Sequence, residues 1–127
     1  MILNALKEIC GETAENSGWH EDAPDPTLTP LDHSMWVTTK IMLVVSELSE
    51  AVEEIRSGHS VDHVYHSGEK MKPEGFPVEV ADAMIRILDL WWTLEKQGFD
   101  MPELAQLIKG KVDYNANSRG HKHGKTL

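Results

Sequence analysis

The sequence predicts an all-α fold, a bundle of about four helices that forms a single domain over residues 1–127. Two observations support this class. Apolar residues recur at intervals of three and four over long segments, and no stretch alternates polar and apolar residues as a half-buried strand would. The length of 127 residues also fits one domain, and Gly and Pro separate the periodic segments from one another.

The first two predicted helices are separated by a proline-rich loop. Residues 3–17 form the first helix, which Gly18 ends. Residues 19–30, WHEDAPDPTLTP, contain three prolines and are expected to form a loop. A long second helix begins at an N-cap residue, Asp32 or Ser34, and runs to Arg56 before Gly58.

The second half of the chain is expected to contain two more helices. Residues 57–75 carry Gly, His and Lys and are expected to be a connector that holds at most a short helical turn. Pro77 opens the third helix and Gly98 ends it. The last helix runs from a cap at Asp100, with Pro102 in its first turn, through Asn115, and the tail from about residue 116 is expected to be flexible.

Composition excludes several classes of function. The formal net charge of −9 argues against nucleic acid as a main partner, because the chain has no basic patch to neutralise phosphates. Cys10 is the only cysteine, so no intrachain disulfide can form. No signal peptide and no apolar run long enough to span a bilayer are found, so we expect no membrane partner and a cytoplasmic location.

Two pairs of acidic residues are the most informative feature of the chain. Glu47 and Glu50 lie in SELSEAVEEIR, and Glu79 and Asp82 lie in VEVADAMIRILD. Residues three apart share one face of a helix, so two such faces brought together would concentrate these carboxylates in one small volume. Carboxylates that close repel each other unless cations lie among them, and oxygen ligands of this kind suit Mg²⁺, with Mn²⁺ able to substitute.

Helical geometry separates the acidic residues of the second helix. At about 100° per residue, Lys40, Glu50 and Glu54 fall within roughly 60° of Glu47. Glu53 projects elsewhere, towards solvent. The apolar stripe of this helix lies beside the carboxylates, about 100° away. It consists of Ile41, Val44, Val45, Leu48, Ala51, Val52 and Ile55.

The third helix strengthens the case for a metal. Glu79, Asp82, Arg86 and Asp89 share one narrow stripe, and almost every other residue is apolar, which is typical of a buried helix. Buried charge without a partner is very costly. The alternative to a metal is an ion-pair network in which Arg86 and another basic side chain neutralise the stripe. Because an acidic pair on the second helix is matched by another on a helix as apolar as the third, a metal site is favoured over an ion-pair network.

Other residues with possible roles each have a structural alternative. Lys40 is a candidate phosphate ligand, or an ion-pair partner of Glu47 or Glu50. Trp19 could stack on a base or pack at a rim. His59, His63 and His66 have metal-like spacing, but they lack an acidic or thiolate anchor and are expected in a surface loop. Trp91 and Trp92 are expected in the core.

Three segments of the sequence resemble one known family. The two acidic pairs, GWHED near the start, KPEGFPVEVADAMIRILDL in the middle and KVDYNANSRGHKHGK at the end are similar to the short, phage-type branch of the MazG-like all-α nucleoside triphosphate pyrophosphohydrolases. The resemblance implies a helical bundle completed by a second subunit, in a dimer or tetramer. It implies cleavage of a nucleoside triphosphate between its α- and β-phosphates. The cytoplasmic location expected above would be the host's if a phage encodes the chain.

The resemblance also implies roles for particular residues. Mg²⁺ would be held by Glu47, Glu50, Glu79 and Asp82. The chemistry of anhydride cleavage itself, which needs an activated water, makes Glu47 or Glu50 the candidate acceptor of the water's proton. The basic run near the end of the chain would bind phosphate, whereas without the resemblance it would be a solubilising tail. That run comprises Lys111, Tyr114, Asn115, Arg119 and Lys125.

The chain departs from the family pattern in two places. Ser46 stands where many members have Glu, and Arg119 lies one residue beyond the usual place, which Ser118 occupies. Two alternatives to a general pyrophosphohydrolase remain. One is a non-catalytic helical oligomer whose acidic stripes pair across an interface, and the other is a base-specific relative that acts on dUTP or dGTP.

Overall fold

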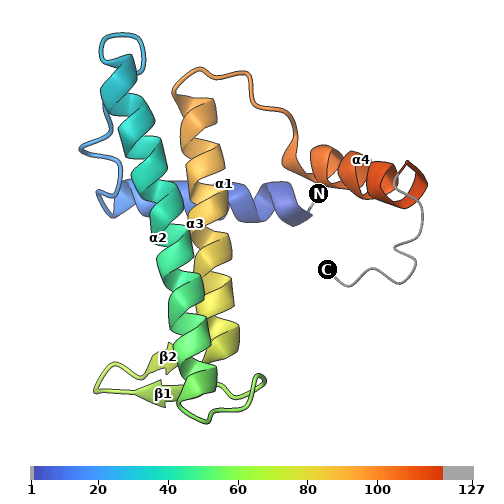
Figure 1. Ribbon diagram of the computed structural model, residues 1–127. Coiled ribbons are helices and arrows are strands. Elements are labelled where there is room, and N and C mark those ends of the chain that lie inside the picture. The colour runs from blue at the N-terminus through green and yellow to red at the C-terminus, as the bar shows by residue number, and fades with distance from the viewer. Residues whose placement is uncertain (1, 119–127) are drawn as a thin grey trace.

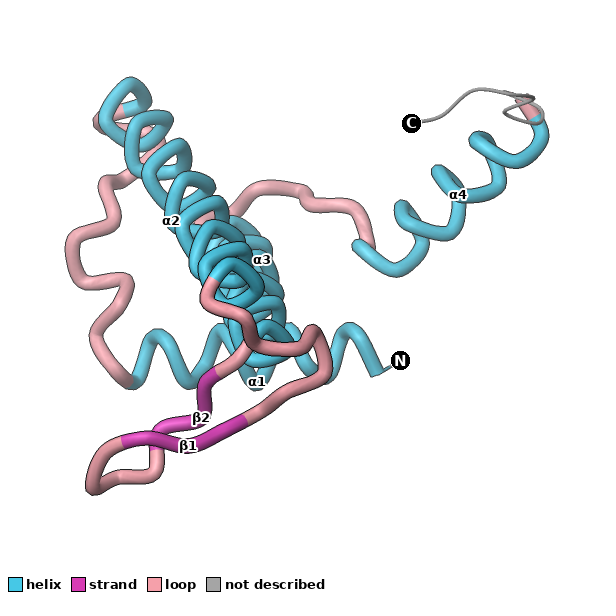
Figure 2. Tube along the Cα trace, turned by 60° about the horizontal axis from the view of Figure 1, so that its bottom comes forward, coloured by secondary structure: helices cyan, strands magenta, loops and turns pink. Residues whose placement is uncertain are grey.

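The computed structural model describes residues 2–118 and confirms the all-α class (Figure 1). The helices are α1 (Ile2–Asn16), α2 (Pro30–Arg56), α3 (Phe76–Lys96) and α4 (Leu104–Asn117). α2 and α3 run side by side in opposite directions, and α1 crosses them. α4 projects away from this group in both backbone views and contacts α1 alone among the described elements (Figures 1 and 2).

A small β-hairpin joins α2 to α3, so the prediction of a connector with at most a helical turn was wrong (Figure 2). β1 (Tyr65–Ser67) pairs antiparallel with β2 (Lys72–Glu74), with Tyr65 opposite Glu74 and Ser67 opposite Lys72. Gly68 and Met71 take left-handed backbone conformations in the turn, with φ of 75° and 54°. Strands of three residues are too short to show the alternation by which strands are recognised in a sequence.

Two helix starts differ from the prediction because proline determines them. α2 begins at Pro30 after Thr29, so neither Asp32 nor Ser34 is its cap. The fixed φ of proline suits the first helical position. α4 begins at Leu104 after an extended Glu103. Pro102 keeps the preceding residue out of the helical region, and Asp100 therefore caps no helix.

Other expectations about the helix ends have mixed outcomes. Pro77 lies in the first turn of α3 and Gly98, with φ of 97°, follows its end, as predicted. α4 continues through Asn117, so the chain is still helical where a flexible tail was expected. None of the helices within residues 2–118 is both long and apolar enough to cross a membrane.

The core is small and lies where α1 and α2 meet α3. The buried apolar residues are Ala14, Ala51, Ala83, Leu88 and Trp92. Gly11 allows α1 to cross α3 closely, because a Cβ at this position would lie 2.1 Å from Cδ2 of Trp92. Trp92, only 3% exposed, is in the core as predicted, whereas Trp91 is half-buried and donates its indole N–H to the carbonyl of Pro102.

Much apolar surface remains uncovered in the single chain. Of the apolar stripe predicted on α2, Ala51 is buried, but Leu48 is 45% exposed and Val52 is 52% exposed. α4 has no buried residue, and Ile108 and Val112 on it are 49% and 58% exposed. α3 is less completely buried than its sequence predicted, with Met84 and Ile85 at 43% and 40% exposure.

Candidate metal centre

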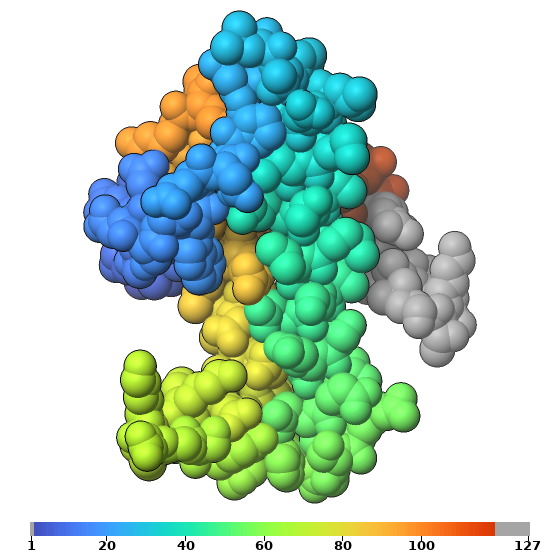
Figure 3. Space-filling view, turned by 90° about the vertical axis from the view of Figure 1, so that its left-hand side faces the viewer, coloured from blue at the N-terminus to red at the C-terminus, as the bar shows by residue number. Residues whose placement is uncertain are grey.

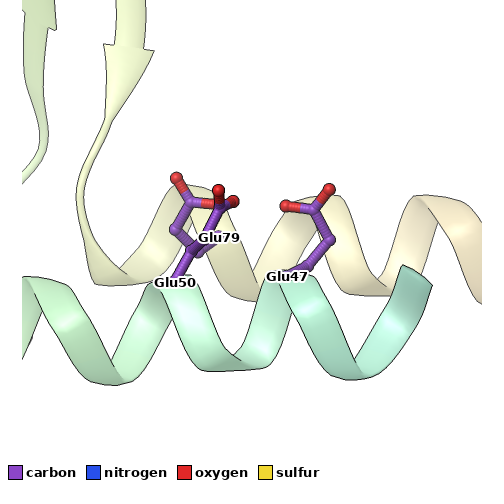
Figure 4. Close-up of side chains that lie close together, drawn as sticks. All are labelled: Glu47, Glu50 and Glu79. Carbon is purple, nitrogen blue, oxygen red and sulfur yellow. The ribbon is translucent and has the colours of Figure 1, made fainter. Parts of the chain in front are cut away.

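Three of the predicted metal ligands meet between α2 and α3 (Figure 4). Glu47 and Glu50 come from successive turns of α2, and Glu79 comes from the first turn of α3. One carboxylate oxygen from each lies within 4.8 Å of the other two. Figure 4 shows the three side chains pointing to the side on which the hairpin strands rise. The antiparallel packing of the two helices therefore produces the cluster that the spacing predicted.

Asp82, the fourth predicted ligand, lies next to this cluster but outside the group of three. Burial raises the pKa of Asp82, and the charge of Glu47 raises it further, while the nearby cations Arg86 and Lys72 oppose the shift. Asp82 therefore shares the electrostatic environment of the cluster. The sequence alone did not single out Lys72, although its place in the Lys-Pro-Glu-Gly run before α3 puts it beside the acidic helix start.

Glu79 is the most strongly perturbed carboxyl group of the cluster. It is 8% exposed, and its Oε2 atom is buried without a hydrogen-bond partner among the described residues. Burial, followed by the contact with Glu50 and the charge of Glu50, raises the pKa of Glu79 to about 7. A buried oxygen that lacks a donor is costly, and a cation that binds there would satisfy it.

Glu47 is held in its ionised form by a neighbouring cation. Burial acts to raise the pKa of Glu47, but the hydrogen bond from Arg86, the contacts with Glu50 and Glu79 and the charge of Arg86 outweigh it and lower the pKa. Arg86 Nε donates to Glu47 Oε1 at 2.9 Å. Arg86 thus forms part of the ion-pair network considered as the alternative to a metal. No second basic side chain forms an ion pair with the acidic group within residues 2–118.

Two other acidic residues of the predicted faces serve different structural purposes. Asp89 lies apart from the cluster, and its Oδ1 is 2.7 Å from Nε2 of His20 in the loop after α1. Glu54 accepts hydrogen bonds from the Tyr65 hydroxyl at 3.0 Å and contacts Nδ1 of His59 at 2.6 Å. Glu53 projects away from the cluster as predicted, since its side chain is 68% exposed.

A groove of about 650 Å³ adjoins the acidic cluster. Its lining comprises Gly18, Trp19, Glu21, Asp22, Lys40 and Arg86. Arg86 links the two regions, because its guanidinium lies 5.4 Å from the Trp19 ring and its Nε contacts Glu47. Lys40 lies 5.4 Å from the Trp36 ring, and among the described residues it forms no ion pair with Glu47 or Glu50. The structure thus brings Trp19 and Lys40 together beside the carboxylates.

On the side of the molecule that carries the groove, Figure 3 shows a hollow in the surface. The hollow lies between the segment of α1 and its following loop, coloured blue, and the hairpin, coloured yellow-green. α3, coloured yellow, lies at its floor. The hairpin and the loop after α1 are therefore opposite walls of one depression.

The candidate phosphate ligands on α4 are not brought to this site within one chain. Lys111, Tyr114 and Asn115 are exposed on α4, which projects away from α2 and α3 (Figure 1). Lys111 Nζ lies 4.7 Å from the Tyr114 ring. Arg119 and Lys125 lie outside the described residues.

The histidines of the connector do not form a metal site. His63 and His66 are exposed, although His66 lies in β1 and not in a loop. His59 is half-buried against Glu54, so the prediction that these histidines lack an acidic partner was wrong for His59. The His63 ring stacks on Tyr65 at 5.3 Å between centroids. Within residues 2–118, the group of Glu47, Glu50 and Glu79 is the one place where at least three potential ligand atoms of His, Cys, Asp or Glu converge.

The chemistry of the donor set fits a hard divalent cation. All the converging atoms are carboxylate oxygens, the preferred ligands of Mg²⁺, and the cluster opens beside a groove that holds further cationic side chains. Comparison of the chain with known protein families, with curated proteins and with solved structures found no match in any of the three.

Proposed function

We propose that the chain is a Mg²⁺-dependent pyrophosphohydrolase of the MazG-like type. It would cleave a nucleoside triphosphate, in the first place a deoxynucleoside triphosphate, to the monophosphate and pyrophosphate in the cytoplasm. The observation that carries the proposal is the convergence of Glu47, Glu50 and Glu79 within 4.8 Å. The sequence resemblance, and a groove of about 650 Å³ beside the cluster that can take a nucleotide, support it.

The protonation of the cluster supports a metal-binding role. A pKa of about 7 means that Glu79 holds a proton for part of the time at neutral pH. A cation that binds to its oxygens would replace this proton, so that metal affinity rises with pH. When bound, Mg²⁺ supplies the positive charge that neutralises phosphate oxygens and makes water more acidic.

The two carboxylates of α2 suit different tasks. Glu47 has a lowered pKa and is fixed by Arg86, so it is suited to remain an ionised ligand. Glu50 is exposed and has no cationic partner among the described residues. It is therefore better placed to accept the proton of the attacking water. We assign Glu50 as the general base, and Trp19 and Lys40 in the groove as contacts to the base and phosphates of the nucleotide.

A second copy of the chain completes the proposed site. The exposed apolar residues of α2 and α4 need a cover, and symmetric association is the commonest way to supply one. In such a dimer or tetramer, α4 of one copy would lie over the acidic cluster of another. Lys111, Tyr114 and Asn115 would reach substrate phosphates in this way. Arg119 and Lys125 would follow them in sequence.

Product analysis tests the reaction. The purified chain should be incubated with each common nucleoside triphosphate, dUTP and dGTP included, in the presence of Mg²⁺, and the products separated by anion-exchange chromatography. We expect monophosphate and pyrophosphate in equal amounts, and loss of turnover with a chelator. Diphosphate with orthophosphate, or no turnover of any nucleotide, would contradict the proposal.

One observation favours a second candidate function, a non-catalytic helical oligomer. The ion pair between Arg86 and Glu47 already neutralises part of the acidic stripe without any metal. Such a protein would have the same melting temperature and the same oligomeric state with and without a chelator. The proposed enzyme would instead be stabilised by Mg²⁺.

A further inference from the structure

We propose that Lys72 of the hairpin is a phosphate-binding residue, and that the hairpin holds the polyphosphate against the acidic cluster from the side opposite Lys40. This inference rests on the proposed function, because it assigns a further contact in the same site. It concerns a segment whose strands the sequence did not predict and a cation that has no assigned role.

The pairing of the strands determines on which face of the hairpin the Lys72 side chain lies. Side chains alternate between the two faces of a strand, and directly opposed residues of an antiparallel pair share a face. Tyr65, Ser67, Lys72 and Glu74 therefore lie on one face of the hairpin, and His66 and Pro73 lie on the other. The Tyr65 hydroxyl reaches Glu54 of α2, so the face that includes Lys72 is the one turned to the helices.

Burial agrees with this direction. Tyr65, Ser67 and Glu74 are half-buried, whereas His66 and Pro73 are exposed. Lys72 is exposed as well, although it shares the face of the half-buried residues. A lysine on the face turned to the helices that still contacts solvent is accessible to a ligand that approaches the helices beside the hairpin.

The hairpin is attached firmly enough to position a side chain. Ser67 Oγ donates to Glu74 Oε2 across the two strands, and Tyr65 is hydrogen-bonded to both oxygens of Glu54. Gly75, with φ of 125°, then leads directly into α3. A Cβ at Gly75 would lie 2.2 Å from the carbonyl oxygen of His63, so the chain crosses itself closely at this point.

Charge supports a ligand role for Lys72. β2, which carries Lys72, contacts α3, and Lys72 lies on the face of the hairpin that is turned to the helices. Lys72 forms no ion pair within 4.0 Å with any residue in the described part of the chain, whereas Arg86 is paired with Glu47. Lys72 therefore remains available for an anion.

The arrangement suits a ligand longer than a single phosphate. Trp19, Lys40 and Arg86 line the groove, and Arg86 contacts Glu47. Figure 4 shows the hairpin strands at the other end of the cluster, beyond Glu50 and Glu79. Phosphate oxygens that contact cations held by the acidic cluster would also meet a cationic side chain at each end of the cluster. This distribution of charge fits a polyphosphate that lies across the cluster, with its far end at Lys72.

The test compares Lys72→Gln with Lys70→Gln. Lys70 lies in the turn of the same hairpin, so its substitution makes the same change of charge away from the inward face. The readouts are calorimetric affinities for Mn²⁺ alone and for pyrophosphate in the presence of Mg²⁺, together with KM and kcat for any nucleotide that is hydrolysed. Lys72→Arg retains the positive charge and is measured in parallel.

We expect Lys72→Gln to weaken pyrophosphate binding about tenfold or more, the effect of losing one charge-assisted hydrogen bond. Its affinity for Mn²⁺ and its melting temperature should be unchanged. Lys70→Gln should resemble the wild type, and Lys72→Arg should retain most of the binding.

Equal losses for the Lys70 and Lys72 variants would overturn the proposal, since they would indicate general attraction of an anion. Unchanged pyrophosphate affinity in Lys72→Gln, a simultaneous loss of Mn²⁺ binding, or no pyrophosphate binding by the wild type would also overturn it. Binding of pyrophosphate that depends on Lys72, with no hydrolysis of any nucleotide, would support this inference and contradict the proposed reaction alone.

Discussion

At the scale of single residues, Glu79 determines how the cluster responds to pH. Its pKa is about 7 in the folded chain and 4.5 as the ordinary value, so the folded state retains a proton that the unfolded state loses. The resulting stabilisation is fully present below pH 4.5 and is lost as the pH rises through 7. We expect the metal-free protein to lose stability as the pH rises between these two values, with a slope of at most about 1.4 kcal/mol per pH unit.

Glu79→Gln should remove most of the pH dependence of stability, because a neutral amide has no proton to lose in this range. Urea denaturation with a chelator, at several pH values, measures the free energy of unfolding of the metal-free protein. Glu53→Gln is the matched control, since Glu53 projects away from the cluster. The lowered pKa of Glu47 acts in the opposite sense, but its contribution is lost as the pH falls through its folded pKa, in a more acidic window. A pH dependence that is the same in Glu79→Gln and wild type would contradict the assignment.

The proposed activity depends on the same geometry. We expect Glu50→Gln to abolish turnover and to leave the chain folded, because Glu50 is exposed and removal of one repelling carboxylate does not destabilise the cluster. Asp82→Asn should also abolish turnover. Glu53→Gln should retain nearly wild-type kcat and KM. Steady-state kinetics with circular dichroism as the folding control decide the matter, and an equal loss at Glu50 and Glu53 would show that the assigned face of α2 is wrong.

At the scale of helices, the crossing of α1 over α3 depends on the missing side chain of Gly11. A methyl group there would lie 2.1–2.6 Å from atoms of the buried Trp92 ring. Overpacking of this kind typically costs about 1–3 kcal/mol, so we expect Gly11→Ala to lower the free energy of unfolding by that amount. Gly110→Ala on α4 is the control, because its Cβ would meet nothing within 4 Å and alanine favours helix. Chemical denaturation of both variants tests this, and an unchanged stability of Gly11→Ala would contradict the close crossing.

The helices and the three members of the acidic cluster could be predicted from the sequence because both depend on local periodicity. The spacing of Glu47, Glu50 and Glu79 on apolar-periodic helices led directly to the observed cluster. The hairpin could not be predicted, since three-residue strands leave no pattern. Asp89 was placed in the acidic stripe by angle alone, yet its partner His20 comes from a loop 69 residues away in sequence. Contacts of this range depend on tertiary packing, which spacing does not report.

At the scale of the whole molecule, the uncovered apolar surface predicts association. Ile108 and Val112 are about half exposed on α4, a helix that contacts only α1 among the described elements. We expect the wild type to be a dimer or tetramer at micromolar concentration in light scattering. Ile108→Lys should shift it towards the monomer, because a buried unpaired charge is costly at an interface. Gln106→Lys, on the opposite side of the same helix, should leave the assembly unchanged, and a monodisperse wild-type monomer would contradict the prediction.

The order of the elements along the chain has a consequence for folding. α2, the hairpin and α3 follow one another along the chain, so the three carboxylates of the cluster all lie within residues 47–79. Contacts between segments that are close in sequence form quickly. α4 contacts neither α2 nor α3 among the described elements, so the three carboxylates can meet without it. We therefore expect a cation that binds them to stabilise the paired helices by mass action, whether or not α4 has docked.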